Sequence, residues 1–235
     1  NDAPASSTTE VLTYGVPWIL SINDIQGTGT DSPHVGHSIT TDGIVTAIFA
    51  NTWVIQDGPG PRNGVWVEGG VAPALGSSVT ISGVVDEING NTTITGASVV
   101  SSGSGTLPAS SLVTTGIAGT EDYEGVLVQL SEASCTLYDA DNQQWYVEND
   151  ATDLRVDNTG VTYEPTLGSV YTVTGPMSGN STFTGIVPRN INDIIFVDDP
   201  MAPTIVSTVA QGPTVVLVVF SEDIDPTTAS NPNNY

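Results

Sequence analysis

Apolar and polar residues alternate along most of the chain, in short runs that glycine, proline and asparagine separate. Trp53 and Ile55 lie two positions apart in one run, and Val65 and Val67 have the same spacing in the next. This alternation is typical of strands with one buried face, and the Gly-Pro segment 58–61 between the runs predicts a turn. We predict strands over residues 38–49, 53–57, 64–68, 77–87 and 92–99.

The last two of these strands are separated by an Asn-Gly pair, Asn89 and Gly90. This pair suits the positive backbone angles of a two-residue hairpin turn. Five short strands with alternating apolar residues fit a small closed or partly open barrel. The predicted class is therefore all-β.

The pattern occurs twice. Trp53 and Trp145 are 92 positions apart, and Gly83 and Gly175 have the same offset. A shared offset between landmarks indicates an internal repeat. We predict a second unit of the same fold after residues 101–108, whose serine and glycine content predicts a flexible linker.

Four motifs in the first unit resemble a known family. They are Ile-Asn-Asp-Ile-Gln-Gly at 22–27, Ser-Pro-x-x-Gly at 32–36, Thr-Thr-x-Gly-Ile-Val-Thr-Ala at 40–47, and Trp-x-Ile-Gln-Asp-Gly-x-Gly-Pro at 53–61. Together they resemble the OB-type β-barrel domains of secreted bacterial endonuclease/exonuclease/phosphatase proteins and multidomain surface proteins. With the repeat, the resemblance covers residues 22–198. It implies two tandem OB-like five-stranded barrels, with any hydrolytic chemistry carried by a separate domain.

The chain changes character after residue 198. Residues 203–235 resemble the opening strands of a bacterial Ig-like surface repeat, a fold that needs about 100 residues and seven strands. The run 215–220 is apolar on both faces, and such a strand is prone to pair with another chain. We predict a partial Ig-like strand segment or donor strand whose assembly residues are Val215, Leu217, Val219 and Phe220. The predicted organisation is an N-terminal extended segment (1–20), a first OB-like domain (21–105), a second OB-like domain (106–198) and this segment (199–235).

Charge narrows the range of partners. The chain has 26 acidic and 3 basic residues, a net charge of −23. Nucleic-acid binding and attraction to anionic membranes both depend on Lys and Arg, so neither partner is expected. No run of about 18 apolar residues is present, and membrane insertion is not expected. The composition and a first residue other than Met suit an extracellular or cell-surface protein whose signal peptide has been removed. The single cysteine, Cys135, excludes an intramolecular disulfide and is expected to be a small buried residue.

Candidate chemistry is sparse. No Gly-x-Ser-x-Gly, Walker or dinucleotide motif is present, so we do not expect an enzyme. His34 and His37 are either a metal pair or, as we expect, exposed loop residues. The acidic hairpin after residue 137 is either a calcium site or a solvated loop, since hard cations prefer oxygen ligands. Its candidate ligands are Asp139, Asp141, Glu148, Asp150 and Asp153.

Aromatic residues offer a second kind of site. Trp53, Trp66, Trp145 and Tyr146 form either a stacking platform for a sugar or, as the matched positions of Trp53 and Trp145 favour, parts of the barrel cores. The functional hypothesis is a non-enzymatic extracellular structural protein that assembles with copies of itself, as a filament or surface layer, through terminal strands, with calcium offsetting like-charge repulsion. The alternative is a tandem OB accessory binding module of a secreted nuclease or phosphatase that contacts carbohydrate or another polymer.

Overall fold

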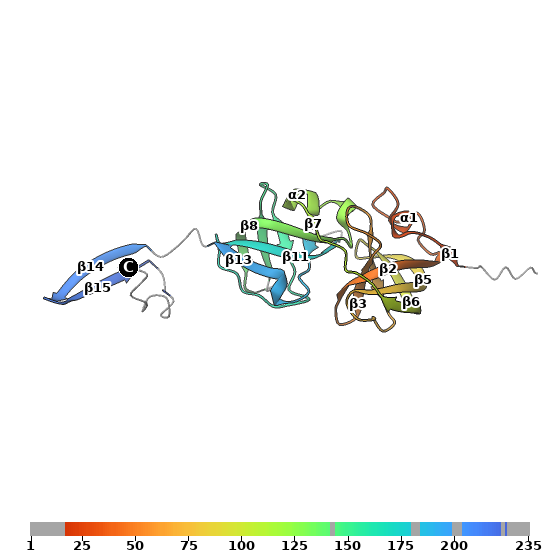
Figure 1. Cartoon of the computed structure of the whole chain (residues 1–235). Helices are drawn as coiled ribbons and strands as arrows, with labels where there is room; N and C mark the ends of the chain where they lie inside the picture. The colour runs from red at the N-terminus through yellow and green to blue at the C-terminus, as the bar shows by residue number, and fades with distance from the viewer. Residues whose placement is uncertain (1–16, 142–143, 180–183, 199–203, 222–223, 225–235) are drawn as a thin grey trace, which may run out of the picture.

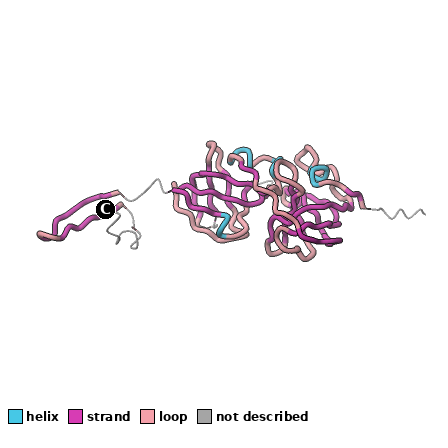
Figure 2. Tube along the Cα trace, in the orientation of Figure 1, coloured by secondary structure: helices cyan, strands magenta, loops and turns pink. Residues whose placement is uncertain are grey.

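The computed structural model describes residues 17–141, 144–179, 184–198, 204–221 and 224. Strands dominate these residues and helices are short, so the predicted all-β class is confirmed. The strands form two larger sheets and one hairpin (Figures 1 and 2).

The first sheet and its helix make up what we call the first β-unit. It contains β1 (Trp18–Ile19), α1 (Ile22–Gln26), β2 (Ser38–Ile48), β3 (Thr52–Gln56), β4 (Gly64–Glu68), β5 (Ser77–Ile88) and β6 (Asn91–Ser104). The strands pair in the order β1-β2-β3-β4-β6-β5, and β2 also pairs with β5. All pairs are antiparallel except β1–β2 and β4–β6. The predicted strands match β2–β6 to within one residue at each end, apart from the end of β6.

The second β-unit begins in the same way, with a short strand and a short helix, and its described residues form two 3-10 helices and one further strand in addition. It contains β7 (Ser111–Leu112), α2 (Thr115–Ala118), η1 (Glu121–Tyr123), β8 (Leu127–Asp139), β9 (Gln144–Glu148), β10 (Leu154–Val156), β11 (Val170–Ser178), β12 (Gly185–Ile186), η2 (Ile191–Asp193) and β13 (Ile194–Asp198). Its strand order is β13-β11-β12-β10-β9-β8-β7, and the additional β11–β8 pairing closes a five-stranded barrel.

Each β-unit has its own hydrophobic core. In β2 the inward positions alternate, so Ile39 and Val45 are fully buried. The short helix α1 adds Ile22 and Ile25 to this first core. The second core forms around Trp145 and includes Cys135, which is buried as predicted.

The internal repeat appears in the strand boundaries. β3 (Thr52–Gln56) and β9 (Gln144–Glu148) begin and end 92 positions apart, the offset found between Trp53 and Trp145. The predicted Asn-Gly turn is confirmed between β5 and β6, where Asn89 and Gly90 have φ angles of 53° and 76°. Such angles suit asparagine and glycine.

The predicted flexible linker at residues 101–108 is wrong in its first part. Residues Ser101–Ser104 belong to β6 and pair with Ser77–Thr80 of β5. Strand pairing uses backbone groups, so a serine- and glycine-rich segment can pair when its partner strand is already in place. In the second β-unit the corresponding positions belong to β13, which pairs with β11 in the same way.

A separate hairpin follows the second β-unit. β14 (Ile205–Gly212) and β15 (Val215–Phe220) pair only with each other among the described strands. In Figure 1 the hairpin lies beyond β13 and apart from both β-units. The first 16 residues and most of the chain after Ser221 lie outside the described residues.

Candidate functional site

The two β-units meet at a junction where their backbones touch. A Cβ atom built on Gly64 of β4 would lie 2.1 Å from the carbonyl oxygen of Gly125, which precedes β8. Only residues without a side chain allow this approach. The fully buried Gln56 lies beside this contact, and its Oε1 accepts a hydrogen bond of 2.7 Å from the backbone N–H of Leu127.

Trp66 provides the apolar part of the junction. Its Nε1–H donates to the carbonyl oxygen of Met177 in the second β-unit, at 3.0 Å. Its ring stacks against Phe49, with 5.7 Å between the ring centroids. Ala47, Val54 and Val187 complete this cluster, which draws on both β-units.

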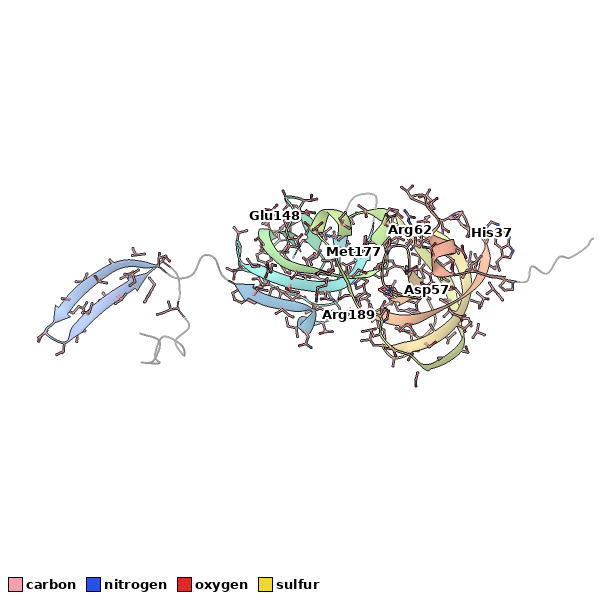
Figure 3. The ribbon with its side chains drawn as sticks, turned by 45° about the horizontal axis from the view of Figure 1, so that its top comes forward. His37, Asp57, Arg62, Glu148, Met177 and Arg189 are labelled. Carbon is pink, nitrogen blue, oxygen red and sulfur yellow. The ribbon has the colours of Figure 1, made fainter. Side chains whose placement is uncertain are left out.

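Two of the three arginines connect the β-units. The Arg62 Nε–H donates to Oδ1 of Asp122 at 2.8 Å, and the Arg62 backbone N–H donates to the Asp122 carbonyl oxygen at 2.6 Å. Arg189 forms a short ion pair with Asp193 and donates from Nη1 to the Thr46 carbonyl oxygen at 3.1 Å. Figure 3 shows Arg62, Met177 and Arg189 where the units meet. The few positive charges of an acidic chain therefore lie largely at its internal junction.

Glu124 is a buried carboxyl group in the same junction. Its side chain is 3% exposed, and its Oε1 accepts hydrogen bonds from the Thr92 N–H (2.7 Å) and the Gln26 side-chain amide (3.3 Å). Burial, with the nearby negative charge of Glu121, raises the pKa of Glu124 to about 8. Burial disfavours the charged form, and like charges add to the effect.

A cavity of about 220 Å³ opens beside Trp66 at the junction. Both β-units line it, mainly with uncharged polar side chains and two carboxylates. The lining includes Trp66, Glu68, Asn89, Asn91, Asp157 and Thr159.

The structure does not bring the predicted aromatic residues together. Trp53 lies in the first core and Trp145 in the second, at 2% and 0% exposure. Tyr146 is partly buried on β9, next to Trp145 in the chain. Trp66 alone of the four lines the junction cavity. A single platform built from all four is therefore not formed.

The predicted calcium ligands have other partners. Asp150 accepts hydrogen bonds from Thr115 Oγ1 and the Gly116 N–H at the start of α2. Asp153 accepts one from Thr136 Oγ1, and Asp139 accepts one from the Asp141 N–H. Glu148 lies away from the junction (Figure 3). Within the described parts of the chain, no three His, Cys, Asp or Glu side chains are grouped to hold a metal ion, so a calcium site stays a prediction.

His37 lies at the far end of the first β-unit from the junction (Figure 3). The His37 ring stacks on the half-exposed Trp18, with 4.7 Å between centroids, and His34 meets Trp18 edge-on at 5.5 Å. His37 is exposed, as predicted, whereas His34 is partly buried.

The hairpin exposes its apolar residues on both faces. Phe220 is partly buried, and the other large apolar side chains of the hairpin are between 38% and 63% exposed. These residues include three of the four predicted assembly residues. They are Ile205, Val206, Val209, Val215, Val216, Leu217, Val218 and Val219.

Sequence reasoning missed the polar residues of the junction, above all Gln26, Gln56 and Glu124. Two signals were available: the glutamines follow apolar residues inside matched motifs, and arginine is rare in the chain.

The sequence matches no known family model and no curated protein. No helix within the described residues has the length and apolar character to cross a membrane.

Proposed function

We propose that this chain is a non-enzymatic extracellular structural protein that assembles with copies of itself through the β14–β15 hairpin. The observation that carries the proposal is the exposure of apolar side chains on both faces of that hairpin. A lone two-stranded hairpin is at best marginally stable in water, so these residues need cover. A second copy can supply it by strand addition, which satisfies backbone groups and buries side chains together.

Charge favours a second copy meeting at this place. Residues 200–221 contain no charged side chain, whereas the chain as a whole carries −23. The two hairpin strands themselves therefore add no like-charge repulsion between copies. Calcium bound elsewhere on the acidic surface would reduce the remaining repulsion.

The second β-unit offers an acceptor edge. β13 pairs with β11 on one side and with no strand on the other among the described residues. Ile195 and Phe196 on this strand are each about half exposed. A hairpin that adds to β13 of the next copy makes a head-to-tail contact, and repeating such a contact builds a filament.

The strand order supports the OB-type resemblance as part of this proposal. Counting the five barrel strands of each unit from β2 and from β8, both units pair in the order 1-2-3-5-4-1, with a parallel pairing of the third and fifth strands. The hairpin would then be the start of an Ig-like sheet that a neighbour completes.

Complementation between two variants tests the proposal. Leu217→Glu places a charge on the hairpin, and Ile195→Glu places one on β13. Sedimentation and electron microscopy of the full chain should show assemblies for the unmodified protein and monomers for each variant. A mixture of the two variants should give one-to-one dimers, because each retains the half that the other lacks. Leu167→Glu, at a similarly exposed leucine outside the hairpin, is the control and should still assemble.

A monomeric unmodified chain, or unchanged assembly of Leu217→Glu, would contradict the proposal. The calcium component is tested separately by adding a chelator, which should shrink the assemblies. If the chelator does not change the size of the assemblies, calcium has no part in them, and the proposed hairpin contact is unaffected.

The junction cavity favours a second candidate, a binding module for a neutral carbohydrate. Sugars stack on aromatic faces and bond to amides, hydroxyls and carboxylates, and Trp66, Asn89 and Asp157 supply such groups. No arginine lines the cavity, so an anionic ligand is disfavoured. Titration with neutral oligosaccharides should shift the Trp66 indole N–H signal in NMR spectra, and Asn89→Ala should weaken the effect. No shift with any oligosaccharide tried would count against this candidate.

A further inference from the structure

Glu124 has an unusual position that assembly through the hairpin does not explain. It follows η1 at the start of the second β-unit, yet its hydrogen-bond partners, Gln26 of α1 and Thr92 of β6, belong to the first. Its backbone pairs with Met177 of β11. One carboxyl group thus connects both β-units at the centre of the junction.

The surroundings of this carboxyl group contain more acceptors than donors. Glu124 Oε2 is buried and has no hydrogen-bond partner within the described residues, and Oε1 of the nearby Gln26 is in the same state. Buried polar atoms are normally paired, so two unpaired acceptors in one place need an explanation. A proton on Glu124 supplies a donor and removes the buried charge.

The charged groups around Glu124 oppose its ionisation. Glu121 of η1 and Glu87 of β5 both act on it with negative charge. The positive charge of Arg62 acts on Glu121, and Arg62 forms its ion pair with Asp122.

Asp31, in the loop after α1, adds a further negative charge near Glu121. The residues that contact Glu124 from α1, β6 and β11 are the neutral Gln26, Thr92 and Met177. Around this carboxyl group, like charge therefore outweighs the arginine.

A small cavity adjoins the carboxyl group. It measures about 40 Å³, and Glu121, Glu124, Met177 and Gly179 are among its lining residues. About 10–15 Å³ is enough to admit a water molecule, so protons can reach the site through solvent.

We propose that protonated Glu124 is a latch that holds the two β-units together, and that its ionisation loosens their junction. In the protonated state the junction buries a neutral group. Once ionised, Glu124 adds a third negative charge beside Glu121 and Glu87, and hydration of that charge favours separation of the units. The pair of β-units would then be rigid in mildly acidic and neutral solution and looser in alkaline solution.

NMR spectroscopy of the full chain tests the latch directly. The carboxyl carbon of Glu124, assigned in the unmodified chain through its own backbone resonances, should titrate with a midpoint near pH 8. The Trp66 indole N–H, which donates across the junction to Met177, should change its signal over the same pH range. The Trp145 indole in the second core should not change.

Glu124→Gln imitates the protonated carboxyl group and should abolish the alkaline change at Trp66. The matched control, Glu148→Gln, removes a glutamate of the second β-unit outside the junction and should leave the change as it is. A Glu124 midpoint near the usual value of 4.5, or a Trp66 change that persists in Glu124→Gln, would overturn the proposal.

A bound cation is the competing explanation for the unpaired oxygens. If adding calcium at pH 8 shifts the Glu124 carboxyl signal and a chelator reverses the shift, the site holds a cation and the proton latch is wrong. An unchanged signal supports the proton. The carboxyl titration of the unmodified chain decides the matter even if Glu124→Gln folds poorly.

Discussion

Gly64 and Gly125 meet backbone to backbone across the junction of the two β-units, with room for a Cβ atom on neither residue. The two glycines come from different copies of the repeat and are 61 positions apart. Gln56, Trp66, Arg62 and Glu124 belong to the same junction, so the backbone contact is accompanied by both polar and apolar contacts.

Gly64→Ala should destabilise the chain by about 1–3 kcal/mol, the usual cost of forcing an atom into a packed region. The added Cβ would lie 2.1 Å from the backbone carbonyl oxygen of Gly125, which cannot rotate away as a flexible side chain can. Urea unfolding monitored by tryptophan fluorescence measures the loss. Gly103→Ala on β6, where a Cβ meets nothing within 4 Å, is the control and should cost far less.

The two junction ion pairs should differ in their contribution to stability. Asp193 is buried and binds Arg189 through both carboxylate oxygens, so Asp193→Ala should cost about 3–5 kcal/mol by leaving a buried charge unpaired. Asp122 is 58% exposed, and Asp122→Ala should cost about 0–1 kcal/mol. Chemical denaturation of both variants checks the order; equal losses would show that burial does not set the difference.

Stability should fall between about pH 4.5 and pH 8 because of Glu124. The pKa of Glu124 is raised to about 8 in the folded chain, so this carboxyl group ionises at lower pH in the unfolded chain. Between the two pKa values, rising pH therefore stabilises the unfolded state relative to the folded state. Glu124→Gln should therefore raise the free energy of unfolding at pH 8, by an amount on the order of a few kcal/mol, and have little effect at pH 4. Urea midpoints at the two pH values measure this; a gain of the same size at both would rule out ionisation as the cause.

Asp150 should produce the opposite pH dependence. Hydrogen bonds from the side chains of Thr114 and Thr115 lower its pKa to about 2. Its contribution is therefore present above its usual pKa near 4 and is lost as the pH falls toward 2. Thermal unfolding of Asp150→Asn should lose that part of the acid dependence while the α2 region stays folded. An unchanged acid profile would show that these hydrogen bonds do not favour the carboxylate.

Alternation located the five strands β2–β6, apart from the end of β6. β4 was predicted at its exact bounds because Val65 and Val67 alternate between clear turn signals. The serine- and glycine-rich end of β6 was missed because its side chains carry no strand signal. The repeat contained the missing information, since the corresponding segment of the second copy is the apolar strand β13.

The junction could not be predicted in the same way. Gln26 and Glu124 are 98 positions apart and meet only because the two β-units dock. Trp66 was expected to act with the other tryptophans, but its outward position on β4 turns it toward Met177 of the other unit. Nothing in the local pattern separates a residue that faces solvent from one that faces a second unit.

The sequence by itself determined the all-β class, the positions of β2–β6, the repeat, the buried Cys135 and the acidic charge. These follow from properties that each residue shows beside its immediate neighbours. The tertiary structure decided which polar residues are buried and which contacts the arginines make. It also decided that the apolar hairpin packs against neither β-unit. Docking joins surfaces far apart in the chain, and its free energy depends on their shape and charge, which no short stretch of sequence contains.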